Sequence, residues 1–409
     1  MTGLAPDPAV PSRDALLEPA TVAAIVSRRL LGGVPVERCE ALHVKYRVGA
    51  SLRAAYRFAA GGREGIVALR TFPPGVSQAR YRLALAAFGP DAVAHAQEAG
   101  AVLWVFPHDR KLAALPRLAD PASLLPGCVT ARVVAYAAER SATAECRGAD
   151  GQVLGYAKLA GPDEARLTRS LAAAADPSEL RVPRVLAADG DVLVVEALAG
   201  RRLDTLGPAA LEPLGAALAA LHGTRPTGRP AATGGTVAAA PLPPFTRLDP
   251  ARLVTAADVV ARARPDVAGR AVRLLARLEA AAEDGRGPAV CLHGDANLRN
   301  AILLDHGRVG LIDLEHVSAG PAAADLGQLL AGLLLRADRR AASAALLAGY
   351  AHVTPPPDRA ALRWHTAACA LARIALPAVG RVRPATLARL PELLDAATRL
   401  FATPTAVAA

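Results

Sequence analysis

Near residue 200 the amino-acid sequence changes from one repeating residue pattern to another. Before this point, short runs of β-branched and aromatic residues are separated by turn residues, as in a meander of antiparallel strands. After it, apolar residues recur every three or four positions, which is typical of helices that bury one face. Strands and helices that occupy separate halves predict an α+β fold with two lobes. Because a chain of 409 residues is too long for one ordinary core, we expect two or three packed units.

The predicted elements can be given as residue ranges. Strands are expected at 42–46, 52–58, 65–71, 133–136, 142–147, 153–159, 182–186 and 192–197, with a hairpin of 302–304 and 309–312. Helices are expected at 20–31, 203–222, 251–263, 267–284, 322–336, 339–351, 357–376 and 384–401. The segment 224–248, rich in Pro, Gly and Thr, is predicted to be a loop.

The first six strands form two groups of three, and the second group begins about 90 residues after the first. Tyr46 and Arg57 in the first group recur as Tyr136 and Arg147 in the second, at the same separation. Two explanations stay open. One is an internal duplication of a small sheet, and the other is coincidence in a sequence of low diversity.

The composition argues against binding to nucleic acid or membrane. The net charge is +10, but aromatic residues make up only 3% of the chain and no basic cluster is interleaved with them. The five cysteines are widely spaced and include no Cys-x-x-Cys pair, which is typical of reduced thiols. No signal peptide is evident, and the longest apolar run, 329–335, is far shorter than the roughly 20 residues of a membrane helix. We therefore expect a soluble, cytoplasmic protein; its oligomeric state is not predicted.

The segment 291–327, CLHGDANLRNAILLDHGRVGLIDLEHVSAGPAAADLG, concentrates acidic and polar residues. Its five acids and two arginines give it a formal charge of −3 within a chain of +10. Carboxylates gathered against the overall charge repel one another unless a cation lies among them. Asp and Asn side chains offer the oxygen ligands that Mg²⁺ prefers when it shares its coordination sphere with phosphate and water.

The spacing within this segment fits phosphoryl transfer. Asp295 and Asn300 lie five residues apart in one predicted loop, and the hairpin that follows can return Asp313 to them. Phosphoryl transfer needs a carboxylate that receives or orients the acceptor hydroxyl, and ligands that hold a metal between phosphates. One loop and one hairpin supply all three groups. The alternative is that these residues serve only the turns, because Asp and Asn favour turns.

These residues also form a recognisable motif. It consists of His293-Gly294-Asp295, Asn300 and Ile312-Asp313-Leu314-Glu315. With this motif the segment resembles the aminoglycoside phosphotransferase and choline kinase-like family of protein-kinase-like enzymes. The resemblance implies that Asp295 is the catalytic residue, that Asn300 and Asp313 bind Mg²⁺, and that ATP is the phosphate donor.

The same resemblance implies supporting roles for three further residues, His293, Glu315 and Asp325. Asp325 stands in a later G-P-x-x-x-D-L element and would brace the catalytic loop. Each residue has a simpler explanation: His293 as a buried, hydrogen-bonded histidine, Glu315 as a solvated carboxylate, and Asp325 as the N-cap of the helix that begins near Leu326.

A lysine for the nucleotide phosphates is expected from the resemblance at the end of the strand 153–159. Lys158 falls where the family places its strand lysine. Of the two candidate partners, Glu164 is favoured over Glu179, which follows Pro177 in a predicted loop. Arg70 holds the comparable place in the first strand group. A planar guanidinium differs from a compact ammonium, so the first group is expected to be structural or regulatory. The simpler alternative for Lys158 is an exposed strand lysine.

The strand 192–200 resembles the hinge between the lobes of the family. Backbone groups near Glu196, Ala197 and Leu198 would then bind adenine. A plain buried strand is the alternative. No Gly-rich phosphate loop stands at 137–141, where the sequence reads AAERS.

The resemblance extends over about residues 130–400. It implies a protein-kinase-like, two-lobed α+β fold with an antiparallel β N-lobe, a mostly helical C-lobe and an extra N-terminal α/β domain. The expected domains are the extra domain at 1–128, the N-lobe at 129–200 and the C-lobe with the catalytic loop at 201–409.

The expected function is ATP- and Mg²⁺-dependent phosphorylation of a hydroxyl on a small molecule, such as a sugar, a metabolite or an antibiotic. Arginines outnumber acids in the helices of 328–401, which disfavours a polycationic aminoglycoside and favours a neutral or anionic acceptor. One alternative is a pseudokinase with a regulatory or scaffold role. Another takes His293, Asp295, Asp313 and His316 as ligands of a hydrolytic metal site.

Overall fold

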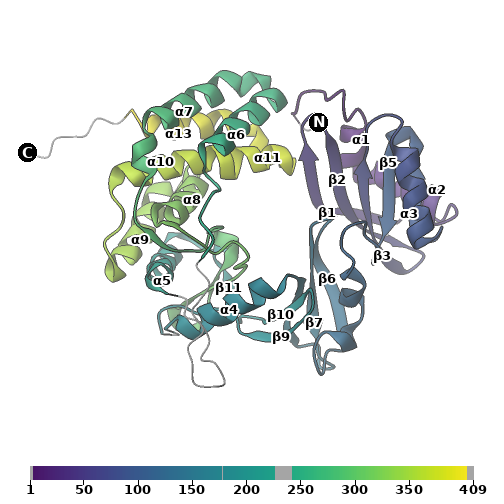
Figure 1. Cartoon of the computed structure of the whole chain (residues 1–409), viewed down its shortest axis with the longest axis horizontal. Coiled ribbons are helices and arrows are strands. Elements are labelled where there is room, and N and C mark those ends of the chain that lie inside the picture. Colours follow the sequence, from purple (N-terminus) through teal and green to yellow (C-terminus); the bar gives the residue numbers. More distant parts are fainter. Residues whose placement is uncertain (1–2, 177, 226–241, 403–409) are drawn as a thin grey trace, which may run out of the picture. The chain divides into compact units, whose positions relative to one another are not determined.

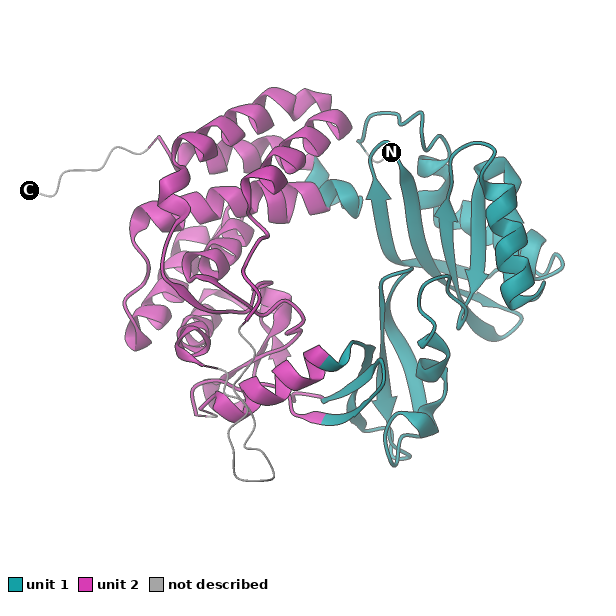
Figure 2. Ribbon diagram, viewed as in Figure 1, with its two compact units in different colours: residues 1–162, 186–195, 378–387 teal, residues 163–185, 196–377, 388–409 magenta. Residues whose placement is uncertain are grey.

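The computed structural model describes residues 3–176, 178–225 and 242–402. The chain divides into two compact units, which Figure 2 shows in different colours. Unit 1 comprises residues 1–162, 186–195 and 378–387, and unit 2 comprises residues 163–185, 196–377 and 388–409. The predicted boundary after residue 128 lies inside unit 1, and the division into three domains remains our proposal.

The first sheet of unit 1 is antiparallel throughout (Figure 1). Its strands are β1 (Arg38–Arg47), β2 (Ser51–Ala60), β3 (Arg63–Thr71), β4 (Val93–Ala96) and β5 (Ala101–Val105), in the order β1-β2-β3-β5-β4. Helices α1 (Arg13–Leu17), α2 (Pro19–Leu30) and α3 (Ser77–Phe88) accompany it. β2 is buried at most of its positions because both faces are covered. On one face Tyr56 donates a hydrogen bond to the carbonyl of Leu16 in α1 (2.6 Å), and on the other Ala55 packs into an apolar cluster with Tyr136.

The second sheet repeats the strand order of the first. Its strands are β6 (Thr130–Ala137), β7 (Ser141–Arg147), β8 (Val153–Leu159), β9 (Val185–Asp189) and β10 (Val192–Glu196), in the order β6-β7-β8-β10-β9. Helix α4 (Pro162–Ala174) follows β8, as α3 follows β3. In both sheets the first strand carries a register shift, between Ala41 and His43 in β1 and between Val133 and Ala135 in β6.

A buried tyrosine contact recurs in the two sheets. The hydroxyl of Tyr46 donates to Asp7 Oδ2 (2.5 Å), and that of Tyr136 donates to Asp109 Oδ2 (2.6 Å). In each case the backbone N–H three residues after the tyrosine donates to the same oxygen, at 2.8 and 2.9 Å. Because the strand order and the tyrosine contact both recur, we propose that the two sheets are copies of one β-rich unit.

The strand register also relates Arg70 to Lys158. Arg70 lies opposite Arg53, and Lys158 lies opposite Thr143, which stands 90 residues after Arg53. The two cationic residues therefore occupy the same position in their respective sheets.

Unit 2 is mostly helical. Its helices are α5 (Leu211–Gly223), α6 (Pro250–Ala263), α7 (Ala268–Ala280), α8 (Ala323–Leu333), α9 (Arg339–Val353), α10 (Arg359–Cys369) and α13 (Leu390–Arg399), with a π-helical segment at Ala370–Ala375. Between them lie two small sheets, formed by β11 (Arg201–Arg202), β13 (Ala301–Leu303) and β14 (Val309–Leu311), and by β12 (Ala289–Leu292) and β15 (Ser318–Pro321). Helices α11 (Leu376–Gly380) and α12 (Pro384–Ala388) lie where the chain passes between the units.

The core of unit 2 places α5 and α9 in close contact. A Cβ at Gly349 would lie 1.8 Å from the carbonyl oxygen of Glu212, and one at Gly215 would lie 2.0 Å from that of Leu346. Only glycine permits such an approach of two backbones. Residues of α5 and α9 belong to one buried apolar cluster, which also includes Leu314 and residues of α8 and β14. This cluster anchors the ends of the segment that carries the motif.

The predicted α+β class is confirmed, with antiparallel sheets in unit 1 and a mostly helical unit 2. Most predicted elements are present with ends shifted by a few residues. The helix predicted at 203–222 begins only at Leu211, and the one predicted at 357–376 contains the π-helical segment. The helix predicted at 384–401 is divided at Arg389. Of the loop predicted at 224–248, residues 226–241 lie outside the described part of the chain.

None of the helices in the described ranges combines the length and the apolar character that crossing a membrane requires.

Candidate active site

The motif segment forms a loop between two short paired elements of unit 2. His293 follows β12, which pairs with β15, and Asn300 immediately precedes β13. Strands β13 and β14 form a hairpin in which Ala301 lies opposite Leu311. The N–H of Ile312 then donates to the carbonyl of Asn300 (2.9 Å), so Asn300 and Asp313 lie at the same end of the hairpin.

His293 ties the loop to the strand end. Its Nε2 lies 3.0 Å from the carbonyl oxygen of Ile312, and its Nδ1 lies 3.3 Å from the backbone N–H of Asp295. Since the N–H of Asp295 can only donate, the histidine carries its proton on Nε2 and donates it to Ile312. The residue is fully buried. This one side chain therefore links the residue that precedes Asp313 to the backbone of Asp295.

Asp325, in the first turn of α8, binds the backbone of the loop. Its carboxylate accepts hydrogen bonds from the backbone N–H groups of His293 (2.7 Å) and Gly294 (3.0 Å), and it pairs with His222 Nε2 (3.2 Å). The other nitrogen of His222 contacts the hydroxyl of Tyr350 (2.9 Å). Burial alone would raise the pKa of Asp325, but His222, His293 and the backbone donors hold it below its usual value.

Asp325 is therefore not an N-cap. The N-cap position of α8 is Ala322, and the Asp325 side chain, only 1% exposed, serves the loop instead.

Gly294 is required by the path of the loop. Its φ is +73°, in the left-handed region, and a Cβ there would lie 2.0 Å from the carbonyl oxygen of His316. Any other residue would be strained and would collide with the backbone of the return segment.

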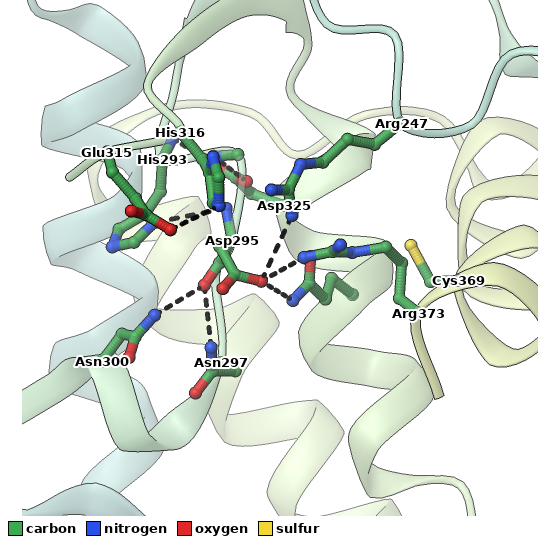
Figure 3. A network of polar contacts seen from close by, with 12 residues as sticks. Arg247, His293, Asp295, Asn297, Asn300, Glu315, His316, Asp325, Cys369 and Arg373 are labelled. Atoms are coloured by element: carbon green, nitrogen blue, oxygen red, sulfur yellow. Dashed lines mark hydrogen bonds and ion pairs between the residues drawn. The ribbon is translucent and has the colours of Figure 1, made fainter. Parts of the chain in front are cut away.

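Asp295 lies among cationic and polar side chains (Figure 3). Its Oδ1 accepts a hydrogen bond from Arg373 Nη2 and one from Gln328 Nε2 (2.9 Å), and Arg247 Nη1 lies 3.7 Å away. Burial by itself would raise the pKa of Asp295, but Arg373, Gln328 and Arg247 outweigh it and keep the pKa below its ordinary value. The low pKa keeps the carboxylate ionised. The side chain is 25% exposed, so another molecule can reach it.

No pattern in the sequence predicts that Arg373, Gln328 or Arg247 lies at this site. Arg373 belongs to the π-helical segment, whose extra residue per turn changes the direction of the side chains. Such segments often occur at functional sites, but no residue spacing in the sequence distinguishes this one from an ordinary helix.

The amide groups of two asparagines hold the backbone of Asp295. Asn297 Nδ2 and Asn300 Nδ2 donate to its carbonyl oxygen, at 2.9 and 3.1 Å. This bond turns Oδ1 of Asn300 away from Asp295, so the oxygen is the atom that can act as a ligand. Asp313 is exposed and has a φ of +63°, an uncommon backbone conformation that Asp tolerates better than most residues. Strained residues of this kind concentrate at functional sites.

Glu315 is exposed and pairs with the neighbouring His316, whose Nε2 lies 2.8 Å from Glu315 Oε1. Within the described ranges no group of three or more His, Cys, Asp or Glu residues could hold a metal ion. This finding argues against the hydrolytic metal site of His293, Asp295, Asp313 and His316. A kinase-type Mg²⁺ site needs fewer protein ligands, because phosphate and water complete the coordination sphere, and Asn300 with Asp313 fits that requirement.

The predicted nucleotide residues lie in two units. Lys158 is in β8 of unit 1, whereas Glu164 is in the first turn of α4 and belongs to unit 2. Glu196 ends β10, and its carboxylate accepts hydrogen bonds from Arg181 Nη2 (2.7 Å) and from the backbone N–H of Arg184 (3.1 Å).

The backbone N–H of Glu196 donates to the carbonyl of Arg184 (2.9 Å), so this N–H serves the pairing of the strands. Ala197 and Leu198 follow as half-buried residues outside regular secondary structure. The backbone groups of these two residues remain the candidates for adenine.

A family model described as "Phosphotransferase enzyme family" matches residues 152–365, which is more than half of the chain. No curated protein matches the sequence.

Solved structures give weaker matches. A choline/ethanolamine kinase family protein from Mesorhizobium loti is 19% identical, with 64% of this chain and 85% of that one covered and a TM-score of 0.44. A macrolide 2'-phosphotransferase from Brachybacterium faecium is 20% identical, with 67% and 92% covered and a TM-score of 0.40. A thermostable mutant of an aminoglycoside phosphotransferase, in complex with AMP-PNP and hygromycin B, is 16% identical, with 68% and 96% covered and a TM-score of 0.49.

Proposed function

Since this chain belongs to the phosphotransferase enzyme family, we propose that it transfers a phosphoryl group from ATP, bound with Mg²⁺, to a hydroxyl of a small molecule. The observation that carries the proposal is the network around His293. It joins the backbone of Asp295 to the strand end before Asp313, while Asn300 is bonded to Asp295 itself. Three oxygen-bearing side chains are thereby held at one end of one hairpin, as phosphoryl transfer requires.

Asp295 is the proposed catalytic residue. Because Arg373, Gln328 and Arg247 keep its pKa low, it is a weak base at neutral pH. We infer that its carboxylate orients the acceptor hydroxyl and accepts its proton late, after the bond to phosphorus has largely formed. Its low pKa also keeps it ionised, and therefore able to accept a hydrogen bond, throughout the neutral range.

Asn300 and Asp313 are the proposed ligands of Mg²⁺. When bound, the metal neutralises the charge that develops on the phosphates. Lys158 is proposed to bind the same phosphates, with Glu164 as its partner, and the backbone near Ala197 and Leu198 to bind adenine. The supporting residues are His293, Asp325 and, through its pair with His316, Glu315.

The acceptor is proposed to be neutral or anionic. Two guanidinium groups, those of Arg247 and Arg373, flank the carboxylate that would meet the acceptor hydroxyl. A polycation would be repelled there, whereas a neutral or anionic compound would not. All five cysteines are free thiols, which supports a reducing compartment, and we propose the cytoplasm.

The test is a phosphate-transfer screen with Mg·ATP against sugars, sugar acids, amino alcohols and antibiotics. Asp295→Asn is expected to lower kcat by about 10²- to 10⁴-fold while nucleotide binding stays near that of the wild type. Asp313→Ala should weaken Mg²⁺ binding, so that activity requires a higher Mg²⁺ concentration. Asp305→Asn, in the exposed turn of the same hairpin, is the matched control and should leave activity unchanged.

Two outcomes would count against the proposal. Nucleotide binding without transfer to any acceptor in the panel would favour a pseudokinase. Equal activity of Asp295→Asn and Asp305→Asn would remove Asp295 from the reaction.

A further inference from the structure

A row of cationic side chains crosses the first sheet of unit 1. Lys45 in β1 lies directly opposite Arg53 in β2, and Arg53 lies directly opposite Arg70 in β3. Residues directly opposite in an antiparallel pair project from the same face of the sheet, and like charges there repel. Three neighbouring strands therefore place three positive charges in one line, an arrangement that destabilises the sheet unless anions compensate.

One carboxylate of the second sheet compensates part of this charge. Glu139, in the turn between β6 and β7, is 3% exposed at its side chain. It accepts hydrogen bonds from Arg53 (3.3 Å), from Arg70 and, with both oxygens, from Arg110 (2.9 and 3.1 Å). Burial would raise the pKa of Glu139, but the three arginines outweigh burial and lower it.

Lys45 is left out of this compensation. Among the residues that the structure describes, none forms a hydrogen bond or ion pair with its ammonium group. The group is half-buried, and a Cβ at Gly380 would lie 3.3 Å from its Nζ, so the segment 378–387 of unit 1 packs over it. Burial lowers the pKa of Lys45, and the charges of Arg381, Arg140, Arg47 and Arg53 lower it further.

The pKa of His43 is lowered by the same excess of positive charge. It precedes Lys45 by two residues in β1 and so lies on the same face of the strand. Burial lowers its pKa to about 4, with Arg381, Arg140, Lys45 and Arg53 contributing. Lys45 and His43 therefore both experience the positive charge of Arg381, Arg140 and Arg53.

The charges can be balanced explicitly. Lys45, Arg53, Arg70 and Arg110 carry four positive charges, and Glu139 carries one negative charge. Asp109 also lies near Arg110, although its oxygens already accept hydrogen bonds from Tyr136 and from backbone N–H groups. With both carboxylates counted, these four cations keep two positive charges, before the other arginines that lower the pKa of Lys45 are counted.

We propose that Lys45, Arg53 and Arg70 form a binding site for the phosphate group of a small anionic ligand, separate from the proposed nucleotide site. A guanidinium presents paired N–H donors to phosphate oxygens, and an ammonium adds a compact charge. The first sheet would then be a ligand-binding element.

The experiment is isothermal titration of the full-length chain with inorganic phosphate, pyrophosphate and AMP, without added metal. The protein carries Lys158→Met, so that phosphate at the proposed nucleotide site does not contribute. In this background Lys45→Met is expected to weaken phosphate binding at least tenfold. Arg38→Met, in the exposed first position of β1, is the matched control and should bind as the parent does.

The variant is expected to fold. The ammonium group of Lys45 has no hydrogen bond to a described residue, and its removal relieves repulsion, so Lys45→Met should unfold at the same or a higher temperature. A second readout is the imidazole resonance of His43, assigned with His43→Gln. Bound phosphate should raise the pKa of His43 above about 4 in the parent and less in Lys45→Met.

The outcomes separate the sources of the phosphate. Binding of inorganic phosphate and AMP alike would support a site for the phosphate group alone. Tighter binding of AMP would support a phosphomonoester ligand. Binding that is equal in Lys45→Met and Arg38→Met, or absent at millimolar concentrations, would overturn the proposal. Loss of binding on Lys158→Met alone would assign the phosphate to the nucleotide site and also overturn it.

Discussion

The substitution Asp325→Asn tests how the catalytic loop is held. The two carboxylate oxygens of Asp325 accept hydrogen bonds from the backbone N–H groups of His293 and Gly294, at 2.7 and 3.0 Å. Asparagine has the same shape, but it offers only one acceptor oxygen and places an NH₂ group where the other stood. One of the two backbone N–H groups must therefore lose its acceptor.

The magnitude follows from these contacts. A buried donor left without a partner costs about 1–3 kcal/mol, and loss of charge from the remaining hydrogen bonds, including that to His222, adds about 1 kcal/mol. We expect the unfolding free energy of this region to fall by about 2–4 kcal/mol. At 1.4 kcal/mol per factor of ten, this equals a roughly 30- to 1000-fold loss of protection of the Gly294 amide against hydrogen exchange.

The effect should depend on pH in a defined direction. Because the folded-state pKa of Asp325 lies below its ordinary value, its ionised form stabilises the fold above the unfolded-state pKa. That stabilisation is lost as pH falls through the lower, folded-state pKa. The difference between wild type and Asp325→Asn should be constant from pH 5 to 8 and decrease below about pH 4.

The assay is hydrogen exchange measured by mass spectrometry, with thermal unfolding alongside. Asp395→Asn is the control, because Asp395 pairs with Arg270 at 3.0 Å on the surface of the same unit and is 40% exposed. Such a pair contributes less than about 1 kcal/mol. If the Gly294 amide were equally protected in both variants, Asp325 would not brace the loop and the reasoning would be wrong.

Three further predictions rest on the same contacts. Gly294→Ala should lower the unfolding free energy by more than about 2 kcal/mol, whereas Gly307→Ala, with φ +75° but nothing within 4 Å of its Cβ, should cost only about 1–2 kcal/mol in thermal unfolding. Arg373→Met should remove the strongest of the charges that lower the pKa of Asp295, so the acid limb of the pH–rate profile should move to higher pH, while Arg270→Met leaves it in place. Glu139→Gln should destabilise unit 1 by about 3–5 kcal/mol in urea unfolding, because Arg53, Arg70 and Arg110 lose their common carboxylate. Glu64→Gln removes the carboxylate of an exposed ion pair and is the control. Equal loss of stability in the two variants would contradict the prediction.

Local spacing was enough to predict the class of fold and the family. Strand and helix patterns depend on neighbouring residues, and they predicted β1, β2, β3, β6, β7 and β8 with small errors at the ends. The motif residues lie within one loop and one hairpin, so Asn300 and Asp313 lie at the same end of the hairpin, as the sequence spacing implies. His293, Gly294 and Asp295 belong to the same loop, and their roles in the reaction stay predictions.

Packing decided the surroundings of these residues. Arg373 reaches Asp295 across 78 positions and Gln328 reaches it across 33, and neither is marked by any local pattern. Glu139 meets Arg53 and Arg70 across 86 and 69 positions, because a turn of the second sheet packs against one face of the first. Periodicity tells which face of an element is buried, but not which distant charge is buried against it. The pKa of Asp295 and the excess charge around Lys45 are therefore properties of the folded chain alone.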